Sequence, residues 1–274
     1  MSRISQTFAI LKANGDKALI PYISCGDPSL EFTEKLACSL EKAGADLLEL
    51  GVPYSDPVAD GPTIQKASQR ALAQGVTLEK IFHLATRLRT QIKIPQILMT
   101  YYNPIYCYGL EKFAADASRA GVDGIIVPDL PLEEAGAFKK YTDAYNLDLI
   151  FIVAPTTTAE RLERIAAAAR GFLYCISVLG VTGSRGELPK SLEEFMTGIR
   201  SYTELPLAVG FGVSTPEMAR RVAQTADGVI VGSSLIERIE KNMPVIPKEP
   251  EKVIGEISSY LNNLKYGMTL DRKI

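Results

Sequence analysis

Short apolar segments alternate with longer, helix-like segments along nearly the whole chain, and this alternation limits the fold more than any other feature. Several apolar segments are β-rich and apolar nearly throughout, which is typical of parallel strands covered on both faces. The segments between them are rich in Ala, Leu, Glu, Lys and Arg. The expected strands are 19–24, 46–50, 96–101, 124–127, 149–153, 173–178, 205–210 and 228–232. The expected helices are 30–43, 63–73, 77–91, 110–120, 132–144, 159–169, 191–203, 215–225 and 251–264.

Eight strand–helix units within 274 residues, preceded by one further N-terminal helix, predict an α/β fold that closes as a single (β/α)8 TIM barrel. No linker rich in Pro, Gly or Ser divides the chain, so we expect one domain over residues 1–274. An open, doubly wound sheet is the alternative, but no G-x-G-x-x-G motif follows the first strand. The tail at 266–274 carries no motif and is expected to fray.

The composition argues against several classes of function. His83 is the only histidine, which excludes most Ser-His-Asp triads and His-rich metal sites, so we expect no metal. A net charge of −2 gives no electrostatic attraction for nucleic acid or an anionic membrane. No apolar run reaches the roughly 18 residues of a membrane span. The four cysteines form no C-x-x-C pair, which indicates small buried side chains in a reducing cytoplasm.

In such a barrel the functional groups lie on the loops after the C-terminal ends of the strands. Neither lysine nor histidine stands at these ends, which argues against a Schiff-base or a zinc-dependent aldolase. Glycine-rich loops follow the last three strands, at 180–183, 210–214 and 232–234, and Ser214 and Ser234 are expected to begin capping boxes. Free N–H groups at helix starts bind phosphate, so we expect a phosphorylated small molecule here. The alternative is that the glycines only permit tight turns.

The second strand and its loop hold three acids among apolar and proline residues. Glu49 interrupts the apolar strand, and because Leu48 and Leu50 face the helices, period-two alternation directs Glu49 into the barrel mouth. Burial raises the pKa of such a carboxyl group and lets it exchange protons near neutral pH. Asp56 and Asp60 follow in the loop.

Each acid also has a structural alternative. Glu49 could form a salt bridge, although no basic residue stands at a neighbouring strand end. Asp56 could be an ordinary turn residue before Pro57. Asp60 could be the N-cap of the helix that begins near Pro62.

The segment 49–65, ELGVPYSDPVADGPTIQ, closely resembles the signature of the tryptophan synthase alpha chain family. Further motifs of that family follow in the same order over essentially the whole chain. These are PYISCGDP at 21–28, MTYYNP at 99–104, PDLP at 128–131, APTT at 154–157, GVTG at 180–183 and GFGVS at 210–214.

The resemblance implies a lyase of tryptophan biosynthesis that cleaves indole-3-glycerol phosphate to indole and glyceraldehyde 3-phosphate. Glu49 and Asp60 match the two catalytic carboxylates of the family. The implied phosphate site consists of Gly183, Phe211, Gly212, Gly232 and Ser233. The implied indole pocket consists of Tyr22, Met99, Ile126, Ile152, Tyr174, Thr182 and Ile230.

The resemblance also implies a partner, a pyridoxal-phosphate-dependent beta chain in an assembly of two alpha and two beta chains. No cofactor is expected in this chain itself. The candidate contact residues are Asp56, Pro57, Asn103 and Pro104, although the segment 103–108 could equally fold into the local core. The segment 182–189 is expected to be a lid in which Thr182 reaches toward Asp60. Val178-Leu179 departs from family members that carry an arginine there, which puts a loop-anchoring contact in doubt.

Two acids are enough for this cleavage because protonated indole can accept the electrons of the breaking bond. We therefore expect Glu49 to transfer the protons and Asp60 to stay ionised beside the ring N–H. One alternative is a catalytically weak homologue that mainly binds and activates the beta chain. Another is a related phosphate-binding isomerase or epimerase barrel, whose usual metal or lysine residues are missing here.

Overall fold

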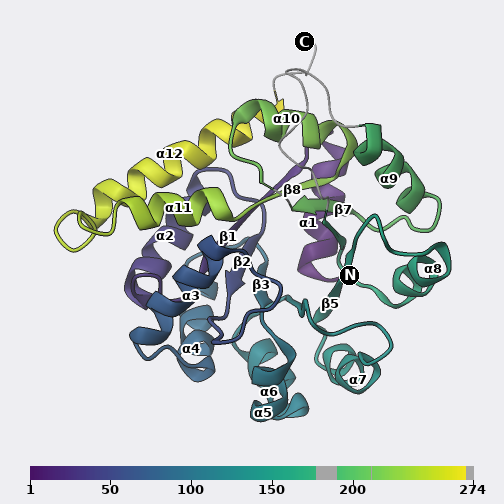
Figure 1. The fold of residues 1–274 in the computed structure, drawn as a ribbon, viewed down its shortest axis with the longest axis horizontal. Helices are drawn as coiled ribbons and strands as arrows, with labels where there is room; N and C mark the ends of the chain where they lie inside the picture. The colour runs from purple at the N-terminus through teal and green to yellow at the C-terminus, as the bar shows by residue number, and fades with distance from the viewer. Residues whose placement is uncertain (177–189, 211, 270–274) are drawn as a thin grey trace.

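The computed structural model describes residues 1–176, 190–210 and 212–269, and its parallel strands form one closed barrel in chain order. This confirms the predicted fold class. The strands are β1 (Ala18–Ser24), β2 (Leu48–Gly51), β3 (Gln96–Met99), β4 (Gly124–Ile126), β5 (Asp148–Val153), β6 (Leu173–Ile176), β7 (Leu207–Gly210) and β8 (Gly228–Val231). Figure 1 shows the helices arranged around these strands.

Every helix expected from the pattern is present, with ends shifted by a few residues. The helices are α1 (Arg3–Ala13), α2 (Leu30–Lys42), α3 (Pro62–Ala73), α4 (Leu78–Arg89), α5 (Tyr102–Tyr108), α6 (Leu110–Arg119), α7 (Gly136–Ala144), α8 (Ala159–Ala168), α9 (Lys190–Arg200), α10 (Pro216–Thr225), α11 (Ser233–Lys241) and α12 (Pro250–Thr269). Helix α12 continues through residues 266–269 of the tail. Residues 270–274 lie outside the described part.

Two helices were not expected as complete elements. The short α5 follows β3 directly, and its seven residues give too few turns for a clear periodic pattern. Helix α11 was expected only from its start. It is strongly amphipathic, with Leu235, Ile236 and Ile239 buried.

The alternation of side chains along the strands divides the apolar residues into two clusters. The parallel register pairs Tyr22 with Glu49 and Glu49 with Ile97, which places these residues in one inward-facing layer. Leu48 and Leu50 belong to the outer cluster between sheet and helices. The inner cluster consists of Ala18, Ile20, Leu47, Ile97, Ile126, Ile150, Phe172, Ala208 and Ile230, together with two residues of α1, Ile4 and Phe8.

Helix α1 therefore closes the barrel at the end where the strands begin. Ile4 is fully buried and Phe8 nearly so, and the ring of Phe8 packs against Phe172 with 5.6 Å between ring centroids. This leaves the opposite end, where the strands finish, for a site.

Glycines reverse the chain between helix and strand at two of these connections. Gly44 after α2 and Gly121 after α6 have φ angles of +101° and +83°, in the left-handed region that favours glycine. Within residues 1–176, 190–210 and 212–269, none of the helices combines the length and apolar character that a membrane crossing needs.

Candidate active site

One cavity, with a volume of about 360 Å³, opens where the strands end. It is lined by residues from strands β1, β2, β3, β5, β6, β7 and β8 and from the loops that follow the strands. The lining residues are Tyr22, Glu49, Ala59, Asp60, Gly61, Ile64, Met99, Pro128, Ile152, Tyr174, Ile176, Gly210, Gly212, Ile230, Gly232 and Ser233. Ten of them were singled out from the sequence, so residues spread over more than 200 positions of the chain meet here.

Glu49 lies on β2 and faces the cavity, which confirms its predicted inward orientation. Its side chain is almost completely buried, and neither carboxyl oxygen has a hydrogen-bond partner among the described residues. Burial raises the pKa of Glu49 to about 8, and the negative charge of Asp60 contributes in the same direction. The salt-bridge alternative is therefore wrong for the described residues. At pH 7 the group is a neutral carboxylic acid that can donate a proton.

Asp60 lies in the loop between β2 and α3 and also faces the cavity. The N-cap of α3 is Gly61, with no side-chain capping bond, followed by Pro62 at the first helical position. The N-cap alternative for Asp60 is therefore wrong, and its carboxyl group remains available to the cavity. Burial raises the pKa of Asp60 to about 6, against a lowering effect from the hydroxyl of Tyr101.

Tyr101 is a neighbour of the site that the sequence interpretation did not single out. It follows β3, is almost fully buried, and its hydroxyl oxygen accepts a hydrogen bond of 3.1 Å from the backbone N–H of Ala59. The signal was present in the alternation of the strand, since Met99 faces the cavity and Tyr101 is two residues further.

Gly212, Gly232 and Ser233 lie together at another wall of the cavity. Gly212 has a φ angle of +58°, and Gly232 is the N-cap of α11, whose first residue is Ser233. The first N–H groups of a helix have no acceptor within the helix, so they are available to an anion at this wall.

The capping boxes expected at Ser214 and Ser234 are wrong. Helix α10 is capped by Thr215, whose side chain accepts from the N–H of Met218, because Pro216 begins the helix one residue later than expected. Ser234 lies inside α11 and donates a hydrogen bond of 3.0 Å to the carbonyl oxygen of Val213. Tyr260 of α12 approaches the Ser234 hydroxyl at 2.9 Å, so these groups tie the two glycine segments together.

The apolar part of the cavity contains most of the residues implied for an indole pocket. Tyr22, Met99, Ile152, Tyr174 and Ile230 line it. Ile126 does not, because it is fully buried in the inner cluster, paired in register with Met99. Ile64, Pro128, Ile176 and Gly210 line the cavity as well.

Several expectations lie outside the described residues. These are Thr182, Gly183 and Phe211, the lid at 182–189, and the departure at Val178-Leu179.

The residues predicted to contact a partner are accessible. Asp56 and Asn103 are exposed, while Pro57 and Pro104 are partly exposed. Figure 1 places α5 beside α6 at the rim of the molecule. Helix α5 fits both alternatives for the segment 103–108 in part. Ile105 is buried in the local core, whereas Tyr106 is 66% exposed and accessible to a partner.

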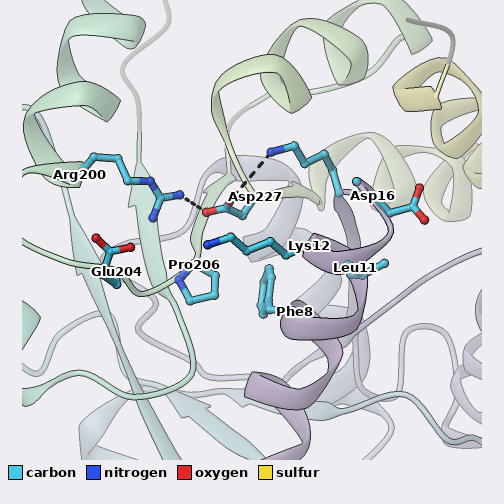
Figure 2. Close-up of a pocket in the computed structure, with 10 residues that line it drawn as sticks. Phe8, Leu11, Lys12, Asp16, Arg200, Glu204, Pro206 and Asp227 are labelled. Atoms are coloured by element: carbon cyan, nitrogen blue, oxygen red, sulfur yellow. Dashed lines mark hydrogen bonds and ion pairs between the residues drawn. The ribbon is translucent and has the colours of Figure 1, made fainter. Parts of the chain in front are cut away.

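A second cavity, with a volume of about 310 Å³, lies at the other end of the barrel and is shown in Figure 2. Phe8, Leu11 and Pro206 form its apolar wall, and Asp227, directly before β8, is paired with Arg200 and Lys17. None of the residues implied for catalysis or substrate binding lines it. Among the described residues, no group of three His, Cys, Asp or Glu side chains is arranged to hold a metal ion.

The comparisons with known proteins agree with this arrangement. A family model described as tryptophan synthase alpha chain matches residues 8–267. The chain is 50% identical over 268 residues to the tryptophan synthase alpha chain of Geobacter sp. (strain M21), covering 98% of each chain. The crystal structure of the tryptophan synthase alpha chain from Legionella pneumophila subsp. pneumophila is similar with a TM-score of 0.91, 39% identity and 100% coverage of both chains. An aminoacrylate-bound crystal structure of tryptophan synthase from M. tuberculosis is similar with a TM-score of 0.86 and 32% identity, covering 98% of this chain and 100% of that one. The chain therefore belongs to the tryptophan synthase alpha chain family.

Proposed function

We propose that this chain is a lyase subunit that cleaves indole-3-glycerol phosphate to indole and glyceraldehyde 3-phosphate in the biosynthesis of tryptophan. The observation that carries the proposal is that a buried carboxyl group, Glu49, and a half-buried one, Asp60, share one cavity with the glycine-lined start of α11. Membership of the tryptophan synthase alpha chain family supports it.

The bond to be broken joins C3 of the indole ring to the glycerol carbon that carries a hydroxyl group. Glu49 donates its proton to C3, which gives an indoleninium ion that can accept electrons. The resulting Glu49 carboxylate then removes the proton of the glycerol hydroxyl. The oxygen electrons form the aldehyde carbonyl, the pair of the broken bond returns to the ring, and Glu49 is protonated again. The raised pKa of Glu49, about 8, suits this alternation near neutral pH.

Asp60 has the complementary role. With a pKa of about 6 it is mostly ionised at pH 7, so it can accept a hydrogen bond from the ring N–H. Its negative charge stabilises the positive charge that develops on the protonated ring. No lysine lines the cavity among the described residues, which fits a reaction in which the substrate supplies the electron sink.

The phosphate group is proposed to bind at Gly212, Gly232 and Ser233, with Gly183 and Phe211 contributing from outside the described residues. The indole ring is proposed to lie among Tyr22, Met99, Ile152, Tyr174 and Ile230, with Thr182 closing over it. Ile126 is proposed to support Met99 from below rather than to touch the ring, because it is fully buried.

The proposed partner is a tryptophan synthase beta chain, in an assembly of two alpha and two beta chains, with pyridoxal phosphate in the beta chain only. Asp56, Pro57, Asn103 and Pro104 are the proposed contact residues. Val58 is 84% exposed and Tyr106 is 66% exposed in the same two segments, and exposed apolar side chains of this kind favour an interface.

We further propose that residues 1–274 act as one domain in the cytoplasm. The support for a reducing compartment comes from the four cysteines, which are free thiols, two of them buried.

The decisive experiment measures indole release from indole-3-glycerol phosphate by the purified chain, with and without a beta chain. Release by the isolated chain that rises on addition of the beta chain is the expected result. A chain that releases no indole under either condition, yet stimulates tryptophan formation from indole by the beta chain, would instead be a binding and activating homologue.

A further inference from the structure

The hydroxyl of Tyr101 contacts the backbone of the loop that carries Asp60. The backbone N–H of Ala59 donates to the Tyr101 oxygen at 3.1 Å, and Ala59 immediately precedes Asp60. Since the oxygen accepts this bond, the hydroxyl hydrogen is left to donate elsewhere. Burial raises the pKa of Tyr101 and the charge of Asp60 adds to this rise, whereas the Tyr101 hydroxyl opposes the rise that burial causes in the pKa of Asp60.

The surroundings of Tyr101 fix the ring in place. The residue follows β3, is 3% exposed, and serves as the N-cap residue of α5. Its ring packs against the ring of Tyr54 with 5.1 Å between centroids and an interplanar angle of 30°. Residues 42 positions apart are thus joined by a rigid side chain, from the end of β3 to the loop before α3.

Within the described residues, the loop that carries Asp60 has few other anchors to the barrel wall. Its backbone turns on itself, with Asp60 N–H donating to the carbonyl of Pro57 at 3.2 Å. Gln65 of α3 donates to the backbone carbonyl of Asp60 at 2.8 Å, which holds the main chain but not the carboxyl group. Val58 is 84% exposed. The bond from Ala59 to the hydroxyl of Tyr101 therefore ties the residue next to Asp60 to the end of β3.

We propose that Tyr101 is a positioning residue for the reaction, whose buried hydroxyl anchors the loop at Ala59 and so keeps the adjacent Asp60 directed into the cavity before the substrate arrives. This rests on the proposed function of Asp60. A carboxylate with one hydrogen bond already made keeps its remaining lone pairs for the substrate, so the ring N–H meets an oriented acceptor.

The other groups that face Asp60 do not replace this interaction. Glu49 on β2 is itself an acid, and the charge of Asp60 contributes to its raised pKa. Tyr22 on β1 is buried and Tyr174 on β6 is half-buried, and their raised pKa keeps both neutral. Asp129, after β4, is an acid that acts on Tyr101 itself. Among the described groups that affect the pKa of Asp60, Tyr101 is the one that lowers it.

The test compares Tyr101→Phe with Tyr54→Phe. Both variants lose one phenol oxygen from the same stacked pair and keep both rings, but the Tyr54 hydroxyl has no described contact with Asp60. The rate of indole release at low substrate is measured from pH 5.5 to 8.5, on the chain alone and with excess beta chain. The ratio of the rates at pH 6.0 and pH 7.5 is taken within each variant, so that a smaller fraction of folded protein cancels.

For Tyr101→Phe, we expect the acidic limb of the pH–rate profile to shift to higher pH by about half to one pH unit. A shift of this size corresponds to the free energy of one ordinary hydrogen bond. The ratio at pH 6.0 to pH 7.5 then falls about two- to four-fold. Tyr54→Phe is expected to keep the limb of the parent. A Tyr101→Phe limb that coincides with the parent limb would overturn the proposal.

Asp60→Asn in the same assay separates the proposed function of Asp60 from the positioning role of Tyr101. If Asp60→Asn turns over like the parent, the proposed function of Asp60 fails. If Asp60→Asn loses activity while Tyr101→Phe keeps the parent limb, only the positioning role of Tyr101 fails.

Discussion

The carboxyl groups of Glu49 and Asp60 face one cavity, and the charge of Asp60 raises the pKa of Glu49. Burial acts on both groups, but more strongly on Glu49, which is 1% exposed. The resulting pKa values of about 8 and about 6 lie on opposite sides of neutrality. One fold thus keeps one carboxyl group protonated and its neighbour ionised at the same pH.

Glu49→Gln is expected to lower kcat for indole release by at least about 10²- to 10⁴-fold, the usual contribution of a positioned proton donor. The amide keeps the shape of the side chain, so binding of the substrate, measured by calorimetry, should stay within a few-fold of the parent.

Asp60→Asn is expected to lose less activity than Glu49→Gln in the same assay, because its amide oxygen still accepts a hydrogen bond from the ring N–H. A larger loss for Asp60→Asn than for Glu49→Gln would reverse the assignment of the two roles.

The dependence of kcat/KM on pH is expected to be bell-shaped. The rising limb near pH 6 reports ionisation of Asp60, and the falling limb near pH 8 reports loss of the Glu49 proton. Because the two carboxyl groups interact, the apparent pKa values of the two limbs describe the pair and not either residue alone. Stopped assays of indole release across this range check the prediction, and a flat profile between pH 5.5 and 9 would contradict it.

Glu49→Gln should also change how stability depends on pH. The pKa of Glu49 rises from 4.5 to about 8 on folding, so the folded protein holds a proton that the unfolded chain has lost. This contribution is complete below pH 4.5 and is lost as the pH rises to about 8. Since one pKa unit corresponds to about 1.4 kcal/mol, the variant should gain a few kcal/mol over the parent between pH 5 and pH 8.5. Urea unfolding at both pH values measures the difference, and a constant difference would argue against a buried, neutral Glu49.

Gly51→Ala is expected to impair substrate binding. A Cβ atom at position 51 would lie 2.1 Å from the hydroxyl oxygen of Tyr22, so the tyrosine ring must move within the cavity that it lines. Overpacking of this kind costs about 1–3 kcal/mol, and we expect KM to rise about ten-fold. Gly255→Ala on α12 is the control, because its Cβ meets nothing within 4 Å. The control should leave KM unchanged and stabilise the helix slightly.

Arg70→Met is expected to destabilise the protein by about 3 kcal/mol, because it leaves a buried carboxylate without its partner. The guanidinium of Arg70 on α3 donates two hydrogen bonds to Asp27, of 2.7 and 2.8 Å, and the Asp27 side chain is completely buried. Arg87→Met is the matched control. Its pair with Glu34 is more exposed than that of Arg70 with Asp27, at 50% for Arg87 and 20% for Glu34, so the loss there should stay below about 1 kcal/mol in urea unfolding at pH 7.

The sequence by itself determined the architecture and half of the site. Strand periodicity distinguishes the two faces of β2, so the inward direction of Glu49 and the outward direction of Leu48 follow from local alternation. The absence of lysine at the strand ends is likewise a property of composition and order. These features depend on neighbours a few residues apart, which is why they can be predicted from the chain alone.

Only the tertiary structure decided what surrounds Asp60. Whether its carboxyl group caps α3 or faces the cavity depended on the helix beginning after Gly61, and helix boundaries are set by packing as much as by propensity. The contact of Tyr101 with this loop joins residues 42 positions apart through the closure of the barrel. The burial of Ile126 beneath Met99 depends on the register between β3 and β4. No local pattern encodes such distances, because they are fixed only when all the strands pair into one closed sheet.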